Sequence, residues 1–178
     1  GNPDYQDYLI HAGWAFNPRA RLSANILVSN DKLTLNDADR GESANADYEN
    51  RVLWLKWDAD WNENLRSTTI FSSSSISDRR TGLLELPGIV SGSLDDTREF
   101  DAIGLKQDWV YASRRTWMLS FGFAGKHQDA TYEFASIKTV AEPFDTILDN
   151  SPLEVRAITA SPEGGQYSAY VEYRWQPR

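Results

Sequence analysis

The stretch "RVLWLKWDADW" at residues 51–61 decides the fold, because its polarity changes at every second position. One set of alternate positions is apolar or aromatic: Leu53, Leu55, Trp57, Ala59 and Trp61. The positions between them become charged: Lys56, Asp58 and Asp60. A period of two predicts a β-strand with one apolar face and one polar face. A soluble barrel or sandwich buries the apolar face, whereas a membrane barrel turns it outward to lipid.

The same alternation recurs along the chain and predicts seven strands in all. Besides 51–61, we expect strands within residues 6–17, 21–29, 65–75, 100–112, 116–126 and 165–175. No amphipathic helix of useful length competes with them. The stretches from Thr116 to Ser136 and from Glu154 to Trp175 are long enough to run about twice the 9 to 11 residues that cross a bilayer. A bulge or kink is expected at "SPEGG", residues 161–165.

The predicted connections alternate in length. Short turns are expected at 17–20, 62–64, 113–115 and the C-terminal end. Long loops are expected at 36–47, 77–98 and 136–153. Up-and-down outer-membrane barrels have this asymmetry, with short periplasmic turns and longer extracellular loops.

Two sets of side chains favour lipid over a soluble core. The first set is charged and falls on the predicted lumen face: Lys56, Asp58, Asp60, Lys106, Asp108, Glu172 and Arg174. Charges are costly inside a small filled barrel but ordinary in a wide polar lumen. The second set is aromatic and falls on the predicted lipid face: Trp14, Phe16, Trp57, Trp61, Trp109, Tyr111, Trp117, Tyr173 and Trp175. Aromatic rings beside every short turn are typical of a girdle at a membrane interface.

Composition bounds the function. The chain has 178 residues, enough for one domain, and a net charge of −8 argues against a nucleic-acid surface. It has no cysteine, which excludes disulfides, thiol catalysis and cysteine-ligated metals. No apolar run is long enough for a transmembrane helix.

Three segments together resemble the barrel of TonB-dependent outer-membrane receptors: "NPRARLSANILVSND" (17–31), "YENRVLWLKWDADWNENL" (48–65) and "GQYSAYVEYRWQP" (165–177). The resemblance covers essentially the whole chain and rests on pattern rather than on a catalytic signature. It implies a barrel of about 22 strands around a plug that the inner-membrane protein TonB engages. We therefore expect residues 1–178 to be one domain, an internal barrel fragment without the plug.

The resemblance implies active uptake of a scarce ligand across the bacterial outer membrane. Its partners would be outer-membrane lipid, TonB through the missing plug, and a small or oligomeric substrate such as a siderophore, vitamin, saccharide or peptide. Three alternatives stay open. They are a small stand-alone pore or adhesion barrel, a soluble β-barrel that binds a small ligand, and an outer-membrane enzyme such as a lipase.

Catalytic and cofactor sites are not predicted. His11 and His127 are far apart in sequence, and no Ser–His–Asp set or phosphate-binding glycine loop is recognisable. Acidic residues cluster at 37–49 and 95–101, in the predicted loops, without the spacing of a calcium loop. We expect them to be solvated, and they would bias the mouth toward cationic ligands. Arg114 and Arg115, at a short turn, are candidates for contact with lipid headgroups.

Overall fold

The computed structural model, which describes residues 2–113, 117–147 and 151–175, is a single antiparallel sheet. Its strands are β1 (Asn2–Asn17), β2 (Ala20–Asp37), β3 (Glu42–Asp60), β4 (Leu65–Leu86), β5 (Val90–Ala112), β6 (Trp117–Val140), β7 (Leu153–Ala160) and β8 (Glu163–Trp175). A four-residue helix, α1 (Phe144–Ile147), precedes β7. The predicted all-β, up-and-down architecture is confirmed.

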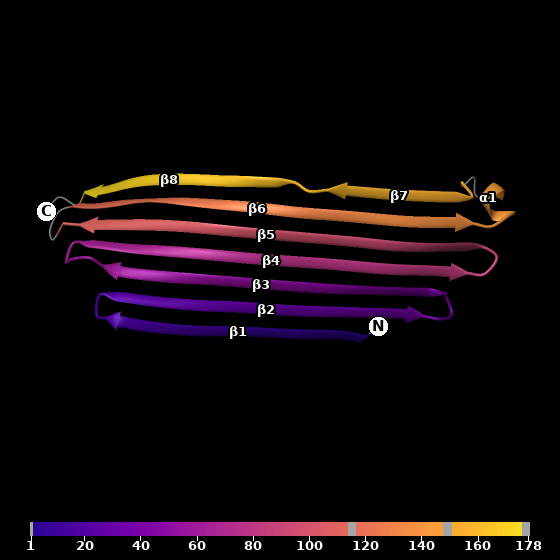
Figure 1. The fold of residues 1–178 in the computed structure, drawn as a ribbon, viewed down its shortest axis with the longest axis horizontal. Coiled ribbons are helices and arrows are strands. Elements are labelled where there is room, and N and C mark those ends of the chain that lie inside the picture. The colour runs from indigo at the N-terminus through magenta and orange to yellow at the C-terminus, as the bar shows by residue number, and fades with distance from the viewer. Residues whose placement is uncertain (1, 114–116, 148–150, 176–178) are drawn as a thin grey trace.

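Each strand pairs with its neighbour in sequence from β1 to β6, and Figure 1 shows them side by side in chain order. β7 and β8 both pair with β6, one after the other, so they form a single interrupted strand. The interruption at Ser161 and Pro162 is the predicted kink within this long stretch. The sheet is open, with β1 at one edge and β7 and β8 at the other. A closed barrel of about 22 strands therefore stays a prediction.

Two of the predicted long loops are wrong. Residues 77–98 form the ends of β4 and β5, which pair from Leu65 and Tyr111 through to Leu86 and Val90. Residues 36–47 are mostly the ends of β2 and β3, joined by a turn over residues 38–41. The backbone N–H of Arg40 donates to Asp37 Oδ1 in this turn, at 3.1 Å. These strand ends carry polar residues on both faces. They therefore lack the alternation in polarity from which a strand is predicted.

The remaining connections agree better with the sequence. Asn17 begins a short turn as predicted, because its Oδ1 accepts the backbone N–H of Arg19 at 2.8 Å. Asn62 Oδ1 likewise accepts the N–H groups of Asn64 and Leu65. The connection predicted at 136–153 is shorter, because β6 continues to Val140. Arg114 and Arg115 lie outside the described residues. No helix in the described part of the chain is long and apolar enough to span a membrane.

The sheet has one layer and no hydrophobic core of its own. In the described residues, the buried apolar side chains are all small, namely Ala59, Ala102 and Val140, and Ser67, Asp96 and Ser120 are the buried polar ones. No large side chain there is fully buried, and many aromatic and aliphatic ones are exposed. Exposed apolar area of this extent marks a surface that another phase or partner covers.

Gly41 gives the first testable prediction, because its φ of 60° is unfavourable for other residues. A Cβ at Gly41 would lie 2.0 Å from the carbonyl oxygen of Glu85. We expect Gly41→Ala to lower the free energy of unfolding by about 1–3 kcal/mol, measured by urea denaturation of the protein in lipid bilayers. Gly88→Ala is the matched control, because Gly88 has a φ of 74° but no atom near its Cβ position. Equal denaturation midpoints for the two variants would contradict the predicted clash.

Candidate functional site

Strand pairing places every residue predicted for the aromatic girdle on one face of the sheet. We call this face A; it carries Trp57 on β3 and Trp109 on β5. Cross-strand partners share a face, and one row on face A runs Trp14, Leu22, Trp57, Thr69, Gln107, Phe123 and Ala169. Gln107 breaks the apolar pattern but has a partner, because Thr69 Oγ1 donates a hydrogen bond to its Oε1.

The rings near the short turns contact one another across strands. Trp61 and Trp109 stack with ring centroids 5.9 Å apart, and Trp109 and Phe121 stack at 6.3 Å. Trp117 contacts Tyr111 at 5.1 Å and Tyr173 at 6.1 Å. The indole N–H of Trp61 donates to Ser67 Oγ at 2.9 Å. Face A therefore ends, beside the short turns, in an aromatic border made of several groups of rings in contact.

The opposite face, face B, carries all the residues predicted to be polar and lumen-facing. Residues two apart on one strand share a face, and near the short turns β3, β5 and β8 use this spacing for ion pairs. Lys56 Nζ lies 2.8 Å from Asp58 Oδ2, and Lys106 Nζ lies 2.9 Å from Asp108 Oδ2. On β8, Arg174 Nε lies 2.6 Å from Glu172 Oε1.

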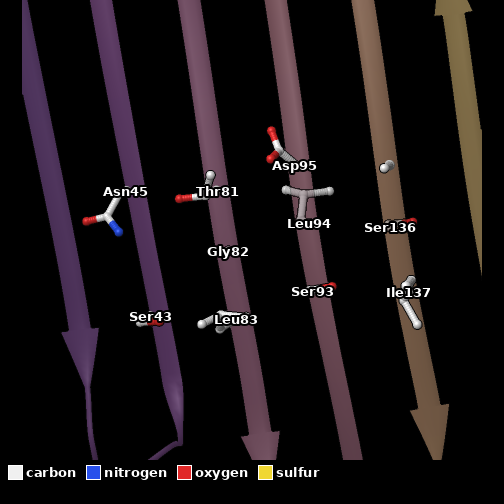
Figure 2. Close-up of a pocket in the computed structure, with 11 residues that line it drawn as sticks. Ser43, Asn45, Thr81, Gly82, Leu83, Ser93, Leu94, Asp95, Ser136 and Ile137 are labelled. Carbon is white, nitrogen blue, oxygen red and sulfur yellow. The ribbon is translucent and has the colours of Figure 1, made fainter.

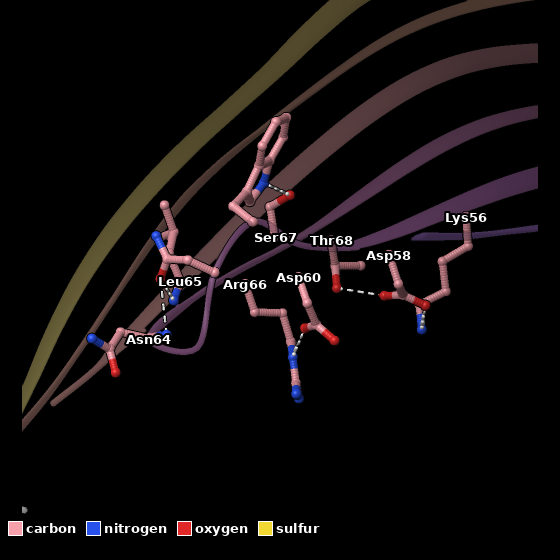
Figure 3. Close-up of polar contacts among 10 residues, drawn as sticks. Lys56, Asp58, Asp60, Asn64, Leu65, Arg66, Ser67 and Thr68 are labelled. Carbon is pink, nitrogen blue, oxygen red and sulfur yellow. Dashed lines mark hydrogen bonds and ion pairs between the residues drawn. The ribbon is translucent and has the colours of Figure 1, made fainter. Parts of the chain in front are cut away.

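Sequence reasoning missed three further members of face B. Arg66 Nε lies 2.7 Å from Asp60 Oδ1, and Thr68 Oγ1 donates to Asp58 Oδ1 at 2.7 Å. Tyr170 Oη donates to Asp108 Oδ1 at 3.0 Å. Figure 3 shows Asp58, Asp60, Arg66 and Thr68 on one side of the sheet and Ser67 on the other. The register of β3 against β4 brings the first two pairs together, and that of β5, β6 and β8 the third, so the sequence of one strand cannot reveal them.

The polarity of face A reverses partway along the strands. Beyond the row Arg51, Ser75, Asp101 and Asp129, its next rows are Glu49, Ser77, Glu99 and Thr131, then Asp47, Arg79, Thr97 and Glu133. We call this part of β2–β6 the distal section, and the part nearer the short turns the proximal section. The apolar band of face A is thus confined to the proximal section, for example residues 103–111 of β5.

Face B reverses in the opposite sense. Its distal rows include Asn50, Ile76, Phe100 and Ala130, then Tyr48, Asp78, Arg98 and Tyr132, then Ala46, Arg80, Asp96 and Phe134. The charges in these rows pair with each other and cover aromatic rings. Arg80 lies 5.4 Å from the ring centroid of Tyr48, and Arg98 lies 5.2 Å from that of Tyr132. These rows of distal face B therefore combine aromatic rings with two ion pairs, Arg80–Asp78 and Arg98–Asp96.

Two bidentate pairs hold these arginines in place. Arg80 Nη2 donates to Asp78 Oδ2 at 2.6 Å, and Arg98 Nη2 donates to Asp96 Oδ2 at 2.8 Å. The hydrogen bonds that the arginines donate to these carboxylates raise the pKa of both arginines above its usual value. Both guanidinium groups therefore stay charged throughout the physiological pH range.

The acidic clusters predicted as solvated loops lie within paired strands instead. Asp47 is 3.5 Å from Lys32 Nζ, and Asp95 is 3.7 Å from Arg79 Nη2, both on face A. Asp96 is only 5% exposed. Several of these carboxylates therefore neutralise basic neighbours, which weakens the expectation that they attract cationic ligands.

The histidines occupy separate environments. His11 lies on face B, with its Nδ1 2.6 Å from Asn25 Oδ1. His127 lies in the middle of β6, not near a strand end, and its Nε2 is 3.2 Å from Asp129 Oδ1. Ligand atoms of His127, Asp129 and Glu163 lie within 4.8 Å of one another, close enough to hold a metal ion. All three side chains are exposed.

A shallow hollow of about 340 Å³ lies over β3–β6 near the far ends of the strands. Figure 2 shows Asn45, Thr81 and Asp95 around it, with Leu83 and Ile137 closer to the strand ends. Amide, hydroxyl and carboxylate groups therefore line one end of the hollow, whereas at the other end Leu83 and Ile137 alternate with Ser43 and Ser93.

Comparison with known proteins leaves the family unassigned. No protein-family model matches the sequence, and no curated protein shows significant similarity to it. Among solved structures, the fold is similar to the crystal structure of Acinetobacter baumannii CarO, at 10% sequence identity. The match covers 89% of this chain and 78% of that chain with a TM-score of 0.30. A TM-score this low assigns neither a fold family nor a function.

Asp96 gives the prediction for this site. Asp96→Asn removes a charged partner from Arg98 on the aromatic part of face B, where Asp96 is almost inaccessible. We expect a loss of about 1–3 kcal/mol in the free energy of unfolding, measured by urea denaturation in lipid bilayers. Asp95→Asn is the adjacent control on face A, where a long, exposed pair with Arg79 is worth about 1 kcal/mol or less. A larger loss for Asp95→Asn would contradict this assignment.

Proposed function

We propose that this chain forms part of the wall of a β-barrel in the bacterial outer membrane, with face A outward and face B toward the lumen. The reversal of polarity between the proximal and distal sections carries the proposal. If face A were inside, as in a soluble barrel, the distal section would bury its charged rows and expose Tyr48, Phe100 and Tyr132 to water. If face B is inside, the proximal band of face A is the one extended apolar area left on the outside among the described residues, with a smaller aliphatic group of Leu83, Ile137 and Val155 at the far strand ends. A surrounding bilayer covers that band.

The dimensions support this orientation. On β5 the apolar band covers residues 103–111, which is the length of about 9 to 11 residues that crosses the hydrocarbon region. The aromatic border beside the short turns then lies at the periplasmic interface. The distal section extends outside the cell, with the polar part of face A in water.

The specific activity that we propose is TonB-dependent uptake of a scarce ligand. The resemblance of the three quoted segments to receptor barrels supports it, as do strands that continue well beyond the membrane. Such uptake requires no chemical change in the ligand, and its energy would come from TonB through a plug domain. A passive pore is the second candidate, because the paired charges of proximal face B suit a polar channel.

Spin-label accessibility tests the orientation. The chain has no cysteine, so single cysteines can be labelled specifically in the protein reconstituted in lipid bilayers. We expect labels at Ile103 and Leu105 to collide with oxygen, which concentrates in lipid. Labels at Lys106, on face B, and at Thr97, on distal face A, should collide instead with a water-soluble nickel chelate. Water-accessible labels at both Ile103 and Leu105 would overturn the proposed orientation.

Uptake measurements test the energy source. Cells expressing the full-length protein, cells lacking its gene and cells lacking TonB would be given labelled ferric siderophores, cobalamin and maltooligosaccharides. We expect at least one compound to enter at least 10-fold more slowly in both mutant strains. Uptake that depends on this gene but persists without TonB would overturn active transport in favour of the passive pore.

A further inference from the structure

Face B is hollowed near the short turns, where β2, β3 and β4 meet. The hollow has a volume of about 480 Å³, and its charged lining consists of Arg19, Arg21, Lys56, Asp58, Asp60 and Arg66. Four basic and two acidic side chains give this lining a net charge of +2, whereas the whole chain carries −8. The hollow is thus a local positive region on a negative protein.

The two carboxylates in the hollow are already engaged. Asp58 accepts from Lys56 on one oxygen and from Thr68 on the other, and Asp60 binds Arg66. Figure 3 shows these contacts along one side of the strands. Arg21 lies opposite Asp58 in the strand register but makes no ion pair with it. Among the described residues, the guanidinium groups of Arg19 and Arg21 have no hydrogen-bond or ion-pair partner.

These two arginines are placed to face an aqueous ligand rather than lipid. Arg21 belongs to β2 and lies on face B, the reverse side of the sheet from the apolar band of face A. It lines the hollow together with Lys56. Arg19 lies in the adjoining turn, where its carbonyl oxygen accepts the N–H of Asp60 at 2.7 Å. This hydrogen bond anchors the turn beside the end of β3. A guanidinium group binds a carboxylate or phosphate through two parallel hydrogen bonds.

We propose that this hollow is an anion-binding site, in which Arg19 and Arg21 bind a carboxylate or phosphate group. This anion-binding site rests on the proposed function in one respect: face B must be open to water. The spin-label experiment tests that condition separately. In the proposed orientation the site lies at the periplasmic end of the lumen. A small anionic ligand would meet it last as it leaves the barrel.

Calorimetric titration with inorganic pyrophosphate tests the site, using the full-length protein in phosphatidylcholine nanodiscs. We expect saturable binding that weakens at least 10-fold in the double variant Arg19→Gln/Arg21→Gln. The charge-matched control is Arg51→Gln/Arg79→Gln, because both of these arginines lie on face A. We expect the control to bind within twofold of the unmodified protein. The double variant Arg19→Lys/Arg21→Lys should give intermediate affinity, because it keeps the charge but loses the planar fork.

The source of the anion is distinguished by adding phosphatidylglycerol to the nanodiscs. Unchanged pyrophosphate affinity supports a soluble ligand, and competition supports a lipid phosphate at the same arginines. Absence of binding, unchanged affinity in Arg19→Gln/Arg21→Gln, or an equal loss in the control would overturn the site. Urea denaturation of each variant, compared with the unmodified protein, confirms that loss of binding is not loss of folding.

Discussion

The register of the backbone ladder is the constraint on which the rest of the structure depends. In a sheet with one layer, side chains pack mainly on their cross-strand neighbours, so the pairing alone decides what each residue meets. A slip of one residue would exchange Leu105 with Lys106 and move every side chain on that strand to the other face. The proximal section resists such a slip because its two faces differ in polarity, and in the distal section a slip would break the cross-strand contact of Arg80 with Tyr48. Cross-strand contacts such as Thr68–Asp58 and Arg66–Asp60 add to this preference only when the register is correct.

The reversal of polarity imposes a second constraint, on the surroundings of the sheet. A uniformly amphipathic sheet has one apolar face and is satisfied by one apolar neighbour. Here the apolar surface lies on face A near Trp57 and on face B near Tyr132, and the two must be covered from opposite sides. Lipid outside covers the apolar part of face A, and protein or ligand inside covers that of face B. Water outside would suit only the distal section of face A. Distal face B, in turn, needs a cover that tolerates the paired charges of Arg80 and Arg98 beside aromatic rings.

The sequence predicts the proximal section well and the distal section poorly, for the same physical reason. Period-two alternation is visible in "RVLWLKWDADW" because one face is apolar and the other is charged. In the distal section the neighbours Arg79 and Arg80 lie on opposite faces but have the same polarity, and so do Asp95 and Asp96. Arg79 and Asp95 lie on the face toward water. Arg80 packs over Tyr48, and Asp96 binds Arg98, which packs over Tyr132. Such strands have no alternation in hydropathy, so they were predicted as a loop, and only the partner strand reveals them.

The break between β7 and β8 coincides with the end of the proposed membrane section. Proline has no backbone N–H, and in hydrocarbon every backbone donor and acceptor must be paired within the protein. Pro162 lies where face A changes from apolar to polar, and its carbonyl oxygen still accepts the N–H of Ala130. β8 pairs without interruption with residues 117–129 of β6, the proximal part, and β7 pairs with the distal residues 132–139. In the proposed orientation, the backbone hydrogen-bond ladder is therefore interrupted at the level where water can bond to unpaired backbone groups. The change of face A from apolar to polar marks the same level.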